Sequence, residues 1–512
     1  MSSVGSKQLA FVDMSGRART TILGVTAVSL VGFVALAILD SQNATLRDGF
    51  VTQTMVWYGV AFAGFLAAVW VNERTPIPLK WIWGAAVVFR LLLLSTSPTL
   101  SDDVYRYIWE GNLLTEGISP YQAPINAAEL DAFDIPARAL VNNPTFASPY
   151  LPVTHVVFAL TAAVLPESPL SFQLVMTLLE LGAAWGLLTL LRLVRIPDRR
   201  ILLWLWNPLV VIEIAHGAHL DAIMISLTIA SLVTTFHPRF AEGSRTGLAS
   251  PVLLGLATLT RPIPVLLTPV LFWRWSWVQR IAYAATLVVG VAPFVLWSGF
   301  GFGDGPGSGV FGSSQEYTET FRFNSAIYQG FEQWVGSQGL DDRGLNEPRL
   351  LTQLIIFGVF LSLMSWIWFS ARQRTIAAND KGVSAALPLL RLAAAPIGVY
   401  VLLTPVFHPW YVLLLLALLV FHSPSDGEQG RRWVALVPWA WLSATLVISY
   451  ITYEDPTFFF ERAWVRRVEW WPTLLAGFVV FAFQRALFTS SIQEQPSAQQ
   501  YCEPNQTAGD HR

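Results

Sequence analysis

The chain of 512 residues is 54% hydrophobic and only 13% charged, with a mean hydropathy of +0.49, so water cannot be the solvent for most of its surface. The formal net charge of −2 gives no basis for binding nucleic acid. The single cysteine, Cys502, excludes an intramolecular disulfide and a cysteine-rich metal site. These properties predict an all-α polytopic membrane protein.

Apolar runs of roughly 17 to 25 residues, the length that crosses a bilayer as a helix, recur along the chain. We interpret the first run as an uncleaved span and not as a signal peptide, because the later spans need an orienting start. The runs predict about twelve transmembrane helices at residues 20–39, 52–71, 80–96, 172–191, 201–217, 220–236, 281–298, 350–370, 385–404, 408–422, 433–451 and 470–489.

Lysine and arginine residues orient these spans. They gather before the first span, around residues 74–80 and at 192–200, and the positive-inside rule assigns such loops to the cytoplasm. The rule predicts a cytoplasmic N-terminus at 1–19, a membrane domain at 20–490 with long outer loops at 97–171 and 299–349, and a disordered tail at 491–512.

Two apolar segments do not fit a simple crossing. The segment 151–166 is short and ends in prolines, so we expect a helix that lies near the outer surface without crossing. The segment 251–273 carries Arg261 beside a proline at its centre. A broken re-entrant hairpin fits it better, since interrupted helices are tolerated where protein covers them.

The stretch SDDVYRYIWEGNLLTEGISPYQAP (101–124) follows directly on a predicted span. If 102–114 is helical, Asp102 and Arg106 share one face of the helix. One interpretation is that both acids of the first turn only stabilise the helix dipole. The other is that Asp102 or Asp103 is a general base at headgroup level, which deprotonates an acceptor hydroxyl while a sugar leaves its polyprenyl phosphate. Arg106 would then keep Asp102 ionised or bind the phosphate.

Five blocks in a fixed order carry a family resemblance. They are SDDVYRYIWEG…GISPYQAP, WNPLVVIEIAHGAHLDA, GLATLTRPIPVLLTPV, FRFNSAIYQGF and HPWYVLLLL. Together, over roughly residues 80 to 420, they resemble the GT-C glycosyltransferases, specifically the bacterial polyprenyl-phosphate-mannose-dependent mannosyltransferases.

The resemblance implies a GT-C-like bundle in the inner or plasma membrane of a bacterium, with an active site that faces the extracytoplasmic side under a first outer loop with juxtamembrane helices. Its members transfer a hexose with inversion from a polyprenyl-phosphate donor; mannose is the favoured sugar here, and a lipid-linked or cell-envelope glycan is the acceptor. In related mannosyltransferases an Asp-Glu pair opens the motif, and its first acid is the usual base. Asp102 therefore ranks above Asp103 as the catalytic residue.

The resemblance also implies a set of substrate-binding residues. In the first loop and the second block they are Arg106, Tyr107, Glu110, Tyr121, His216, His219 and Asp221. For the two histidines and Asp221, a Zn²⁺ site is an alternative that is not favoured, because further ligands are not evident, and a packing role is another. No cofactor is expected to be required.

The later blocks supply the remaining predicted contacts. Arg261 is expected to bind the donor phosphate, with an internal ion pair to a carboxylate as the alternative. Arg322 and Asn324 would bind phosphate and a sugar hydroxyl, or belong to an interfacial anchor. His408, Trp410 and Tyr411 would lie beside the donor, although an aromatic belt also explains the two large rings.

A transporter or flippase of a polyprenyl-linked sugar is the competing function. Such a protein should place polar groups along the whole membrane depth and show inverted repeats. Here the acidic residues crowd the predicted outer face, which favours transfer over transport. The expected partners are the lipid-linked donor, a glycan acceptor and membrane lipids.

Overall fold

The computed structural model describes residues 16–43, 45, 48–241, 246–301, 309–314, 321–338, 347–377, 386–424, 433–454 and 461–493. Most of the predicted N-terminal segment (1–15) and of the predicted tail (494–512) lies outside these residues. The same holds for Cys502 and for parts of the predicted outer loop 299–349.

Long apolar helices dominate the described chain. They are α1 (Gly16–Gln42), α2 (Val51–Arg74), α3 (Leu79–Leu94), α6 (Pro169–Leu193), α9 (Asp221–Phe236), α13 (Trp277–Ser298), α16 (Glu347–Ala377), α17 (Ala386–Leu403) and α20 (Ala463–Gln493). Within the described ranges there is no β-strand, only an isolated bridge between Phe323 and Val406. The prediction of an all-α polytopic membrane protein is confirmed.

Shorter helical pieces connect the long ones. Those of α type are α4 (Asp103–Thr115), α5 (Pro152–Val164), α7 (Leu202–Leu205), α8 (Pro208–Val210), α10 (Pro238–Ala241), α11 (Ala249–Thr258), α12 (Thr268–Leu271), α15 (Tyr328–Ser337), α18 (Leu413–Leu419) and α19 (Val437–Thr445). The turns that matter below are the π-helical turn η5 (Val211–His216) and the 3₁₀ helices η7 (Ile263–Leu267), η10 (Pro409–Val412) and η13 (Leu446–Tyr453).

Seven stretches of the described chain are helical, long and apolar enough to cross a membrane. An eighth forms only if the segment Pro208–His216 is joined to α9, and these two pieces are bent by 117°. About twelve spans were predicted. The difference arises partly because Pro208 begins a new helical piece inside a predicted span, since proline cannot donate the backbone hydrogen bond that a continuous helix needs. The apolar helix Pro409–His422 is also shorter than a full crossing.

Both segments set apart in the sequence take the expected local form. The segment 151–166 is the 13-residue helix α5, which packs against α4. The segment 251–273 is interrupted between α11 and η7, so that Arg261 lies in the break. Its re-entrant course relative to a membrane stays a prediction.

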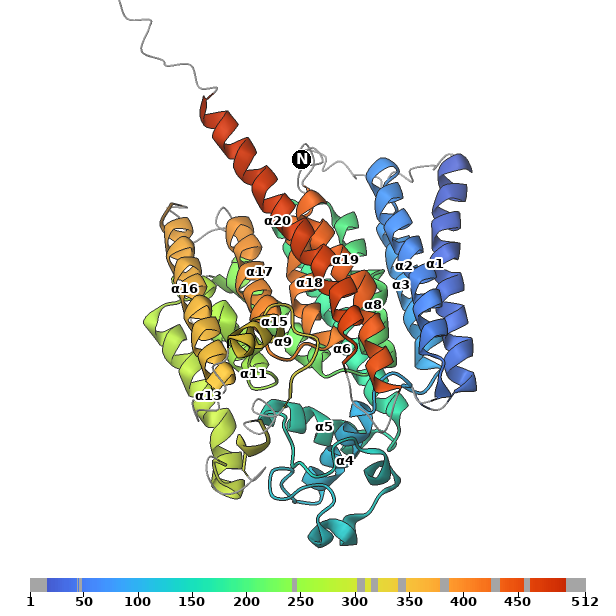
Figure 1. Ribbon diagram of the computed structural model, residues 1–512, viewed down its shortest axis with the longest axis vertical. Coiled ribbons are helices and arrows are strands. Elements are labelled where there is room, and N and C mark those ends of the chain that lie inside the picture. Colours follow the sequence, from blue (N-terminus) through green and yellow to red (C-terminus); the bar gives the residue numbers. More distant parts are fainter. Residues whose placement is uncertain are drawn as a thin grey trace, which may run out of the picture.

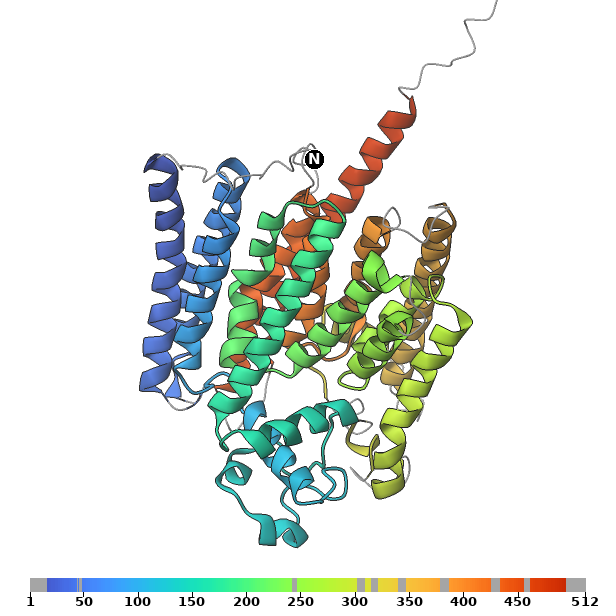
Figure 2. The same cartoon turned by 180° about the vertical axis from the view of Figure 1, so that it is seen from behind.

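The helices form one bundle with a cap at one end (Figure 1). Helices α1 and α2 pack together at one side, and α13 and α16 lie at the other side. Helices α4 and α5 lie beyond one end of the long helices, as the reverse view also shows (Figure 2). The first long loop therefore covers an end of the bundle, which we call the α4–α5 end.

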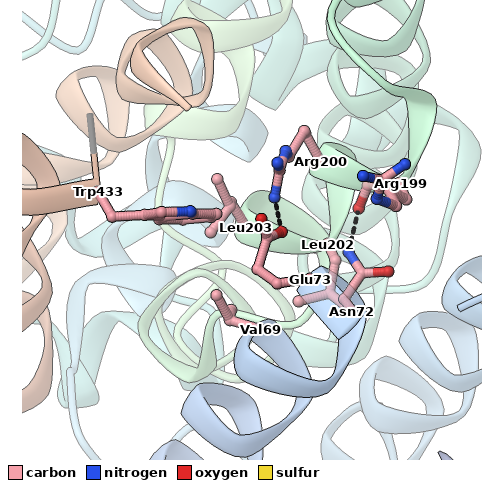
Figure 3. A pocket seen from close by; sticks show the side chains of 8 residues that line it. All are labelled: Val69, Asn72, Glu73, Arg199, Arg200, Leu202, Leu203 and Trp433. Carbon is pink, nitrogen blue, oxygen red and sulfur yellow. Dashed lines mark hydrogen bonds and ion pairs between the residues drawn. The ribbon is translucent and has the colours of Figure 1, made fainter. Parts of the chain in front are cut away.

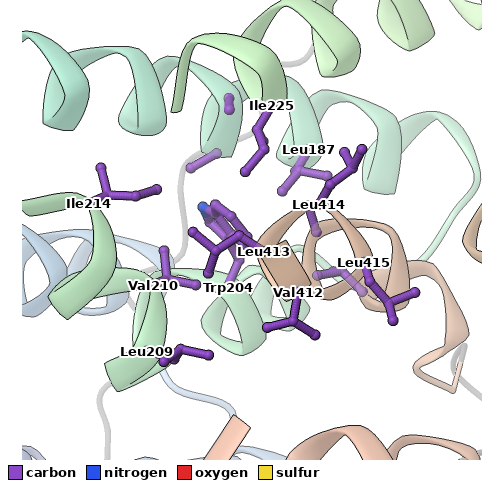
Figure 4. Packing of buried hydrophobic residues seen from close by; sticks show 14 of the residues in the cluster. Leu187, Trp204, Leu209, Val210, Ile214, Ile225, Val412, Leu413, Leu414 and Leu415 are labelled. Carbon is purple, nitrogen blue, oxygen red and sulfur yellow. The ribbon is translucent and has the colours of Figure 1, made fainter. Parts of the chain in front are cut away.

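The apolar core lies where α6, α9 and α18 meet. Leu187, Trp204, Ile225 and Leu413 are fully buried there and interdigitate (Figure 4). In contrast, no residue of the apolar window of α13 is buried, and only 11% of that of α16 is. Since exposed apolar surface of this extent is stable only in a nonpolar solvent, these two helices are expected to contact lipid tails.

The basic loops lie at the end of the bundle opposite α4 and α5. Helix α6 starts next to α5 and runs 25 residues, about 37 Å at 1.5 Å per residue, before Arg192 in its last turn. Arg200 there pairs with Glu73 of α2 and lies over the ring of Trp433 (Figure 3). Arg74 and the segment 192–200 therefore lie at the end of the bundle away from the first long loop, and which side of a membrane each end faces stays a prediction.

A glycine permits the close contact between α4 and α5. A Cβ atom at Gly111 would lie 2.7 Å from the carbonyl oxygen of Phe158, which is backbone and cannot swing away. Gly111→Ala is therefore expected to lower the free energy of unfolding by about 1–3 kcal/mol, the usual range for overpacking. Gly84→Ala on α3 is the control, because open space surrounds a Cβ atom there. Thermal unfolding of both purified variants checks the difference, and equal stability of the two would contradict it.

Candidate active site

The two adjacent aspartates open helix α4, as the sequence predicted. Asp102 occupies the N-cap position and Asp103 the first turn, where the helix dipole favours negative charge. The Ser101 hydroxyl accepts a hydrogen bond from the backbone N–H of Asp103 at 3.3 Å. Both aspartates are half-buried.

Asp103 faces the bundle. Its Oδ1 accepts a hydrogen bond from the side-chain amide of Asn142 at 2.9 Å. Burial, followed by the nearby charge of Asp103, raises the pKa of Tyr107 and of Tyr150 well above the ordinary value. For Asp102 the corresponding neighbour is Tyr105, whose pKa is raised by burial and then by the Asp102 charge. The charges of the two aspartates therefore influence different side chains: Asp103 acts on Tyr107 and Tyr150, and Asp102 acts on Tyr105.

Arg106 is engaged inside the first loop. Its guanidinium pairs with Glu110 at 3.2 Å and donates to the carbonyl oxygens of Asn142 and Asn143 at 2.7 and 2.9 Å. The side chain is buried. These contacts hold the segment around residue 143 against α4 and so position the Asn142 amide that bonds Asp103. The structure thus places Arg106 as a support of the loop.

Glu110 and Tyr121 belong to the same internal network. Glu110 accepts from the Ser148 hydroxyl at 2.8 Å and pairs with His155 Nε2 at 3.1 Å. The Tyr121 hydroxyl lies 3.0 Å from His155 Nδ1 and donates to the Tyr150 carbonyl at 2.7 Å. Buried polar groups that satisfy one another in this way rigidify a loop. Neither predicted substrate contact is shown; both side chains are used within the loop.

The two histidines of the HGAHLD turn point to different partners. His216 Nε2 pairs with Asp40 of α1 at 3.0 Å and lies 3.3 Å from the Thr99 hydroxyl, so it ties the start of the first loop to α1. His219 Nδ1 lies 2.8 Å from the carbonyl oxygen of Glu213 and 3.1 Å from a carboxylate oxygen of the same residue.

A column of four rings connects this turn with two distant segments. The ring of Trp410 stacks on His219 with centroids 3.9 Å apart and on His408 at 4.6 Å. His408 stacks in turn on Phe323 at 4.9 Å, and its Nδ1 lies 3.1 Å from the hydroxyl of Tyr453. The column thus joins the predicted second, fourth and fifth blocks.

Arg261 lies at the break that follows α11. Its Nη2 is 3.4 Å from Asp221 Oδ2, and its guanidinium carbon is 4.9 Å from the ring centre of Tyr411. The ion pair that was the alternative role for Arg261 is present. This ion pair engages only part of the guanidinium group, because Nε of Arg261 has no hydrogen-bond partner among the described residues.

Arg322 and Asn324 are held by other groups. Arg322 pairs with Glu332 at 3.6 Å and lies over the ring of Tyr328 at 5.2 Å. Asn324 has a positive φ of 46°, donates to Glu469 at 2.6 Å and receives the indole N–H of Trp470 on its carbonyl oxygen at 2.9 Å. The amide of Asn324 anchors its loop to α20, and this position in turn sets Phe323 in the ring column.

Several buried polar atoms of the residues described above have no hydrogen-bond partner among the described residues. They are Nε2 of His219, Nε of Arg261 and Nε1 of Trp410, and neither carboxylate oxygen of Asp221 has a hydrogen-bond partner from another described residue. Buried polar groups almost always find such partners, so each of these exceptions requires an explanation. We call Asp103, Tyr107, His219, Asp221, Arg261, His408, Trp410 and Tyr411 the Asp103 cluster. It carries donors and acceptors together, which suits a ligand with both hydroxyl groups and an anionic group.

Sequence reasoning missed three neighbours of the cluster. Asn142 and Tyr150 lie in the irregular part of the first loop, where the sequence carries no periodic signal. Glu213, by contrast, is an acid inside the apolar run WNPLVVIEIAH and is fully buried. The rarity of ionisable residues in such runs was a usable signal for it.

His408 is expected to make the stability of the protein fall in acid. Burial lowers the pKa of His408 to about 3, although Asp103 opposes the shift. The unfolded chain therefore takes up this proton first, at its ordinary pKa of about 6.5. Stability contributed by the neutral ring is complete above that value and is lost as the pH falls toward 3.

The measurement is the apparent Tm of the purified protein between about pH 7 and pH 4. We expect His408→Gln, which has no titrating ring, to show a smaller fall over this range than the unchanged chain. Identical profiles would mean that His408 takes up its proton at an ordinary pKa in the folded protein.

Metal ligands do not converge within the described residues. No group of three or more His, Cys, Asp or Glu side chains is arranged to hold an ion there. The imidazole atoms that would bind Zn²⁺ are partly used, by Asp40 for His216 and by Glu213 for His219. The donor set at this turn is therefore a poor fit to the Zn²⁺ alternative.

Comparison with known proteins gives a consistent picture. A family model described as "Alpha-(1->6)-mannopyranosyltransferase, N-terminal domain" matches residues 16–277, just over half of the chain. This range contains Asp103, the HGAHLD turn and Arg261. No solved structure matches.

Two curated relatives are similar to the chain. The alpha-(1->6)-mannopyranosyltransferase A of Mycobacterium tuberculosis (strain ATCC 25618 / H37Rv) is 25% identical over 247 residues, which are 43% of this chain and 42% of the relative. A probable alpha-(1->6)-mannopyranosyltransferase of Mycolicibacterium smegmatis (strain ATCC 700084 / mc(2)155) is 23% identical over 377 residues, 66% of this chain and 64% of the relative. The matched segments thus span less than two thirds of either relative.

Proposed function

The chain belongs to the alpha-(1->6)-mannopyranosyltransferase family, and we propose on that basis that it transfers a mannosyl residue from a polyprenyl phosphate to a glycan or glycolipid hydroxyl. The supporting observation is the Asp103 cluster, where a carboxylate adjoins unpaired donors and acceptors. A phosphate-linked sugar presents hydroxyl groups that suit Asp221 and an anion that suits Arg261.

We assign the general base to Asp103. Its charge acts on Tyr107, Tyr150 and His408, whereas that of Asp102 acts on Tyr105. In the proposed step the acceptor oxygen forms a bond to the anomeric carbon of mannose while the bond from that carbon to the phosphate oxygen breaks. The hydroxyl proton passes to Asp103, and the bonding electron pair leaves with the polyprenyl phosphate. Attack opposite the leaving group inverts the anomeric configuration.

The extracytoplasmic side is proposed for the same site. The α4–α5 end lies opposite the loops that carry Arg74 and Arg192 to Arg200, which the positive-inside rule assigns to the cytoplasm. At that end, the Asp103 cluster would meet lipid headgroups, where the phosphate of a polyprenyl donor lies.

Transport of a lipid-linked sugar has less support. The charged groups of α3 and α6 deep in the bundle bind each other: Arg90 and Glu180 form a buried two-bond pair at 2.7 and 2.9 Å, and the Trp204 indole N–H also donates to Glu180. These side chains are therefore not available to bind a transported sugar.

The test is an assay of the purified full chain with a panel of polyprenyl-phosphate hexoses and with a nucleotide sugar, followed by linkage analysis of the product. We expect transfer from polyprenyl-phosphate mannose, undiminished by a chelator, because we propose a mechanism without a metal. Transfer from the nucleotide sugar alone, or movement of the donor across a vesicle bilayer without transfer, would contradict the proposal.

A further inference from the structure

The buried carboxylate of Glu213 has no role in the steps above, yet it contacts the Asp103 cluster through His219. Glu213 lies in the turn η5, is fully buried, and accepts the Tyr450 hydroxyl on both carboxylate oxygens at 2.9 and 3.1 Å. An acid at this depth is costly unless it is paired. The same carboxylate also pairs with the imidazole of His219 at 3.1 Å.

The contacts of His219 fix where its protons lie. The Glu213 carbonyl oxygen, 2.8 Å from Nδ1, can only accept a hydrogen bond, so Nδ1 carries a proton. Nε2 then is the atom that remains for a ligand, and it has no hydrogen-bond partner among the described residues. The Trp410 ring, stacked at 3.9 Å, holds the plane of the imidazole.

The surroundings favour a proton on Nε2 as well. Burial disfavours a charged ring, but the hydrogen bond to Glu213 and the charges of Glu213, Asp103 and Asp221 outweigh it and raise the pKa of His219. The stacked indole face of Trp410 is also a favourable neighbour for a cation. A doubly protonated His219 presents an N–H donor at Nε2, and its charge and that of Arg261 both act on the same neighbour, Asp221.

We propose that Glu213 is a positioning residue that orients and charges His219, so that His219 Nε2–H binds the phosphate of the lipid-linked donor together with Arg261. The proposal rests on the proposed function for the identity of the ligand. It assigns the phosphate to the side of the Asp103 cluster formed by His219 and Arg261, and the acceptor hydroxyl to the side of Asp103.

Binding to the purified full chain tests this without requiring turnover. The probes are polyprenyl phosphate and the matching polyprenol, which lacks the anion. His219→Phe retains a ring against Trp410 but has no Nε2–H. It is expected to weaken polyprenyl phosphate by roughly 10- to 100-fold, as for loss of one charged hydrogen bond, and to leave polyprenol unchanged.

Glu213→Gln keeps the shape of the side chain and removes its charge. It is expected to weaken polyprenyl phosphate selectively, and the double variant E213Q/H219F should bind no more weakly than H219F alone, because Glu213 acts through His219. Glu469→Gln is the control, since it makes the same side-chain replacement at another fully buried acid, which bonds Asn324 instead. It should leave the preference for the phosphate intact.

Three results would overturn the proposal: unchanged phosphate binding in H219F, equal losses for polyprenol, or losses that multiply in the double variant. Transfer by the unchanged chain is measured in parallel. Selective loss of phosphate binding in a chain that transfers no hexose would refute the proposed function and leave the role of Glu213 standing. Transfer by the unchanged chain, without a selective loss of phosphate binding in the variants, would support the proposed function and refute the role of Glu213.

Discussion

Asp103→Asn is expected to reduce mannosyl transfer by roughly 10²- to 10⁴-fold, the usual contribution of a positioned general base. Asparagine keeps the size of the side chain and can still bond Asn142, so the helix start should persist. The loss should appear in kcat more than in KM, because the proton is taken in the transition state and not on binding.

Asp102→Asn is the matched comparison one residue away. It removes the same charge from the same helix end, so any loss of dipole stabilisation is shared by both variants. We expect a much smaller loss of transfer from it. If Asp102→Asn proved the more damaging of the two at equal Tm, the base would be Asp102, the acid that the family resemblance ranks first.

The second large effect is expected at Arg261. Arg261→Gln leaves Asp221 buried without its cation, and breaking a buried pair in this way costs about 3–5 kcal/mol of stability. If Arg261 also binds the donor phosphate, the variant should raise the KM for the lipid-linked donor in addition to lowering the Tm.

The double variant R261Q/D221N separates these two roles. Neutralising both partners removes the unpaired charge, so most of the lost stability should return, while donor affinity should stay weak. Arg261→Lys retains the charge without the planar fork, so its donor affinity should lie between that of the unchanged chain and that of Arg261→Gln. Recovery of transfer together with stability in the double variant would reduce Arg261 to a structural partner of Asp221.

Several local features of the structure could be predicted from short sequence patterns. The alternation of apolar runs, the helix that starts at Asp102–Asp103 and the break around Arg261 all follow from local chemistry: apolar length, a dipole-favoured acid pair, and a proline next to a charge. The structure confirms each of them. None of these inferences depends on how the helices pack against one another.

Pairing across long sequence separations is a different matter. The helical period put Asp102 and Arg106 on one face, yet Arg106 bonds Glu110 and two carbonyl groups of a segment nearly 40 residues away. Asn324, expected at a sugar, bonds Glu469 on the last helix. Such partners depend on how whole helices pack, and no short pattern encodes that packing.

The amino-acid order by itself determined that this chain is a polytopic membrane protein and that it resembles enzymes that use lipid-linked sugars, because apolar length and charge placement are additive along the chain. Only the tertiary structure decided that Asp103 faces the bundle, that a column of four rings unites three distant blocks, and that Glu213 lies behind His219. These contacts arise from side chains brought together by helix packing, where an unpaired buried atom can be recognised only once all of its neighbours are in place.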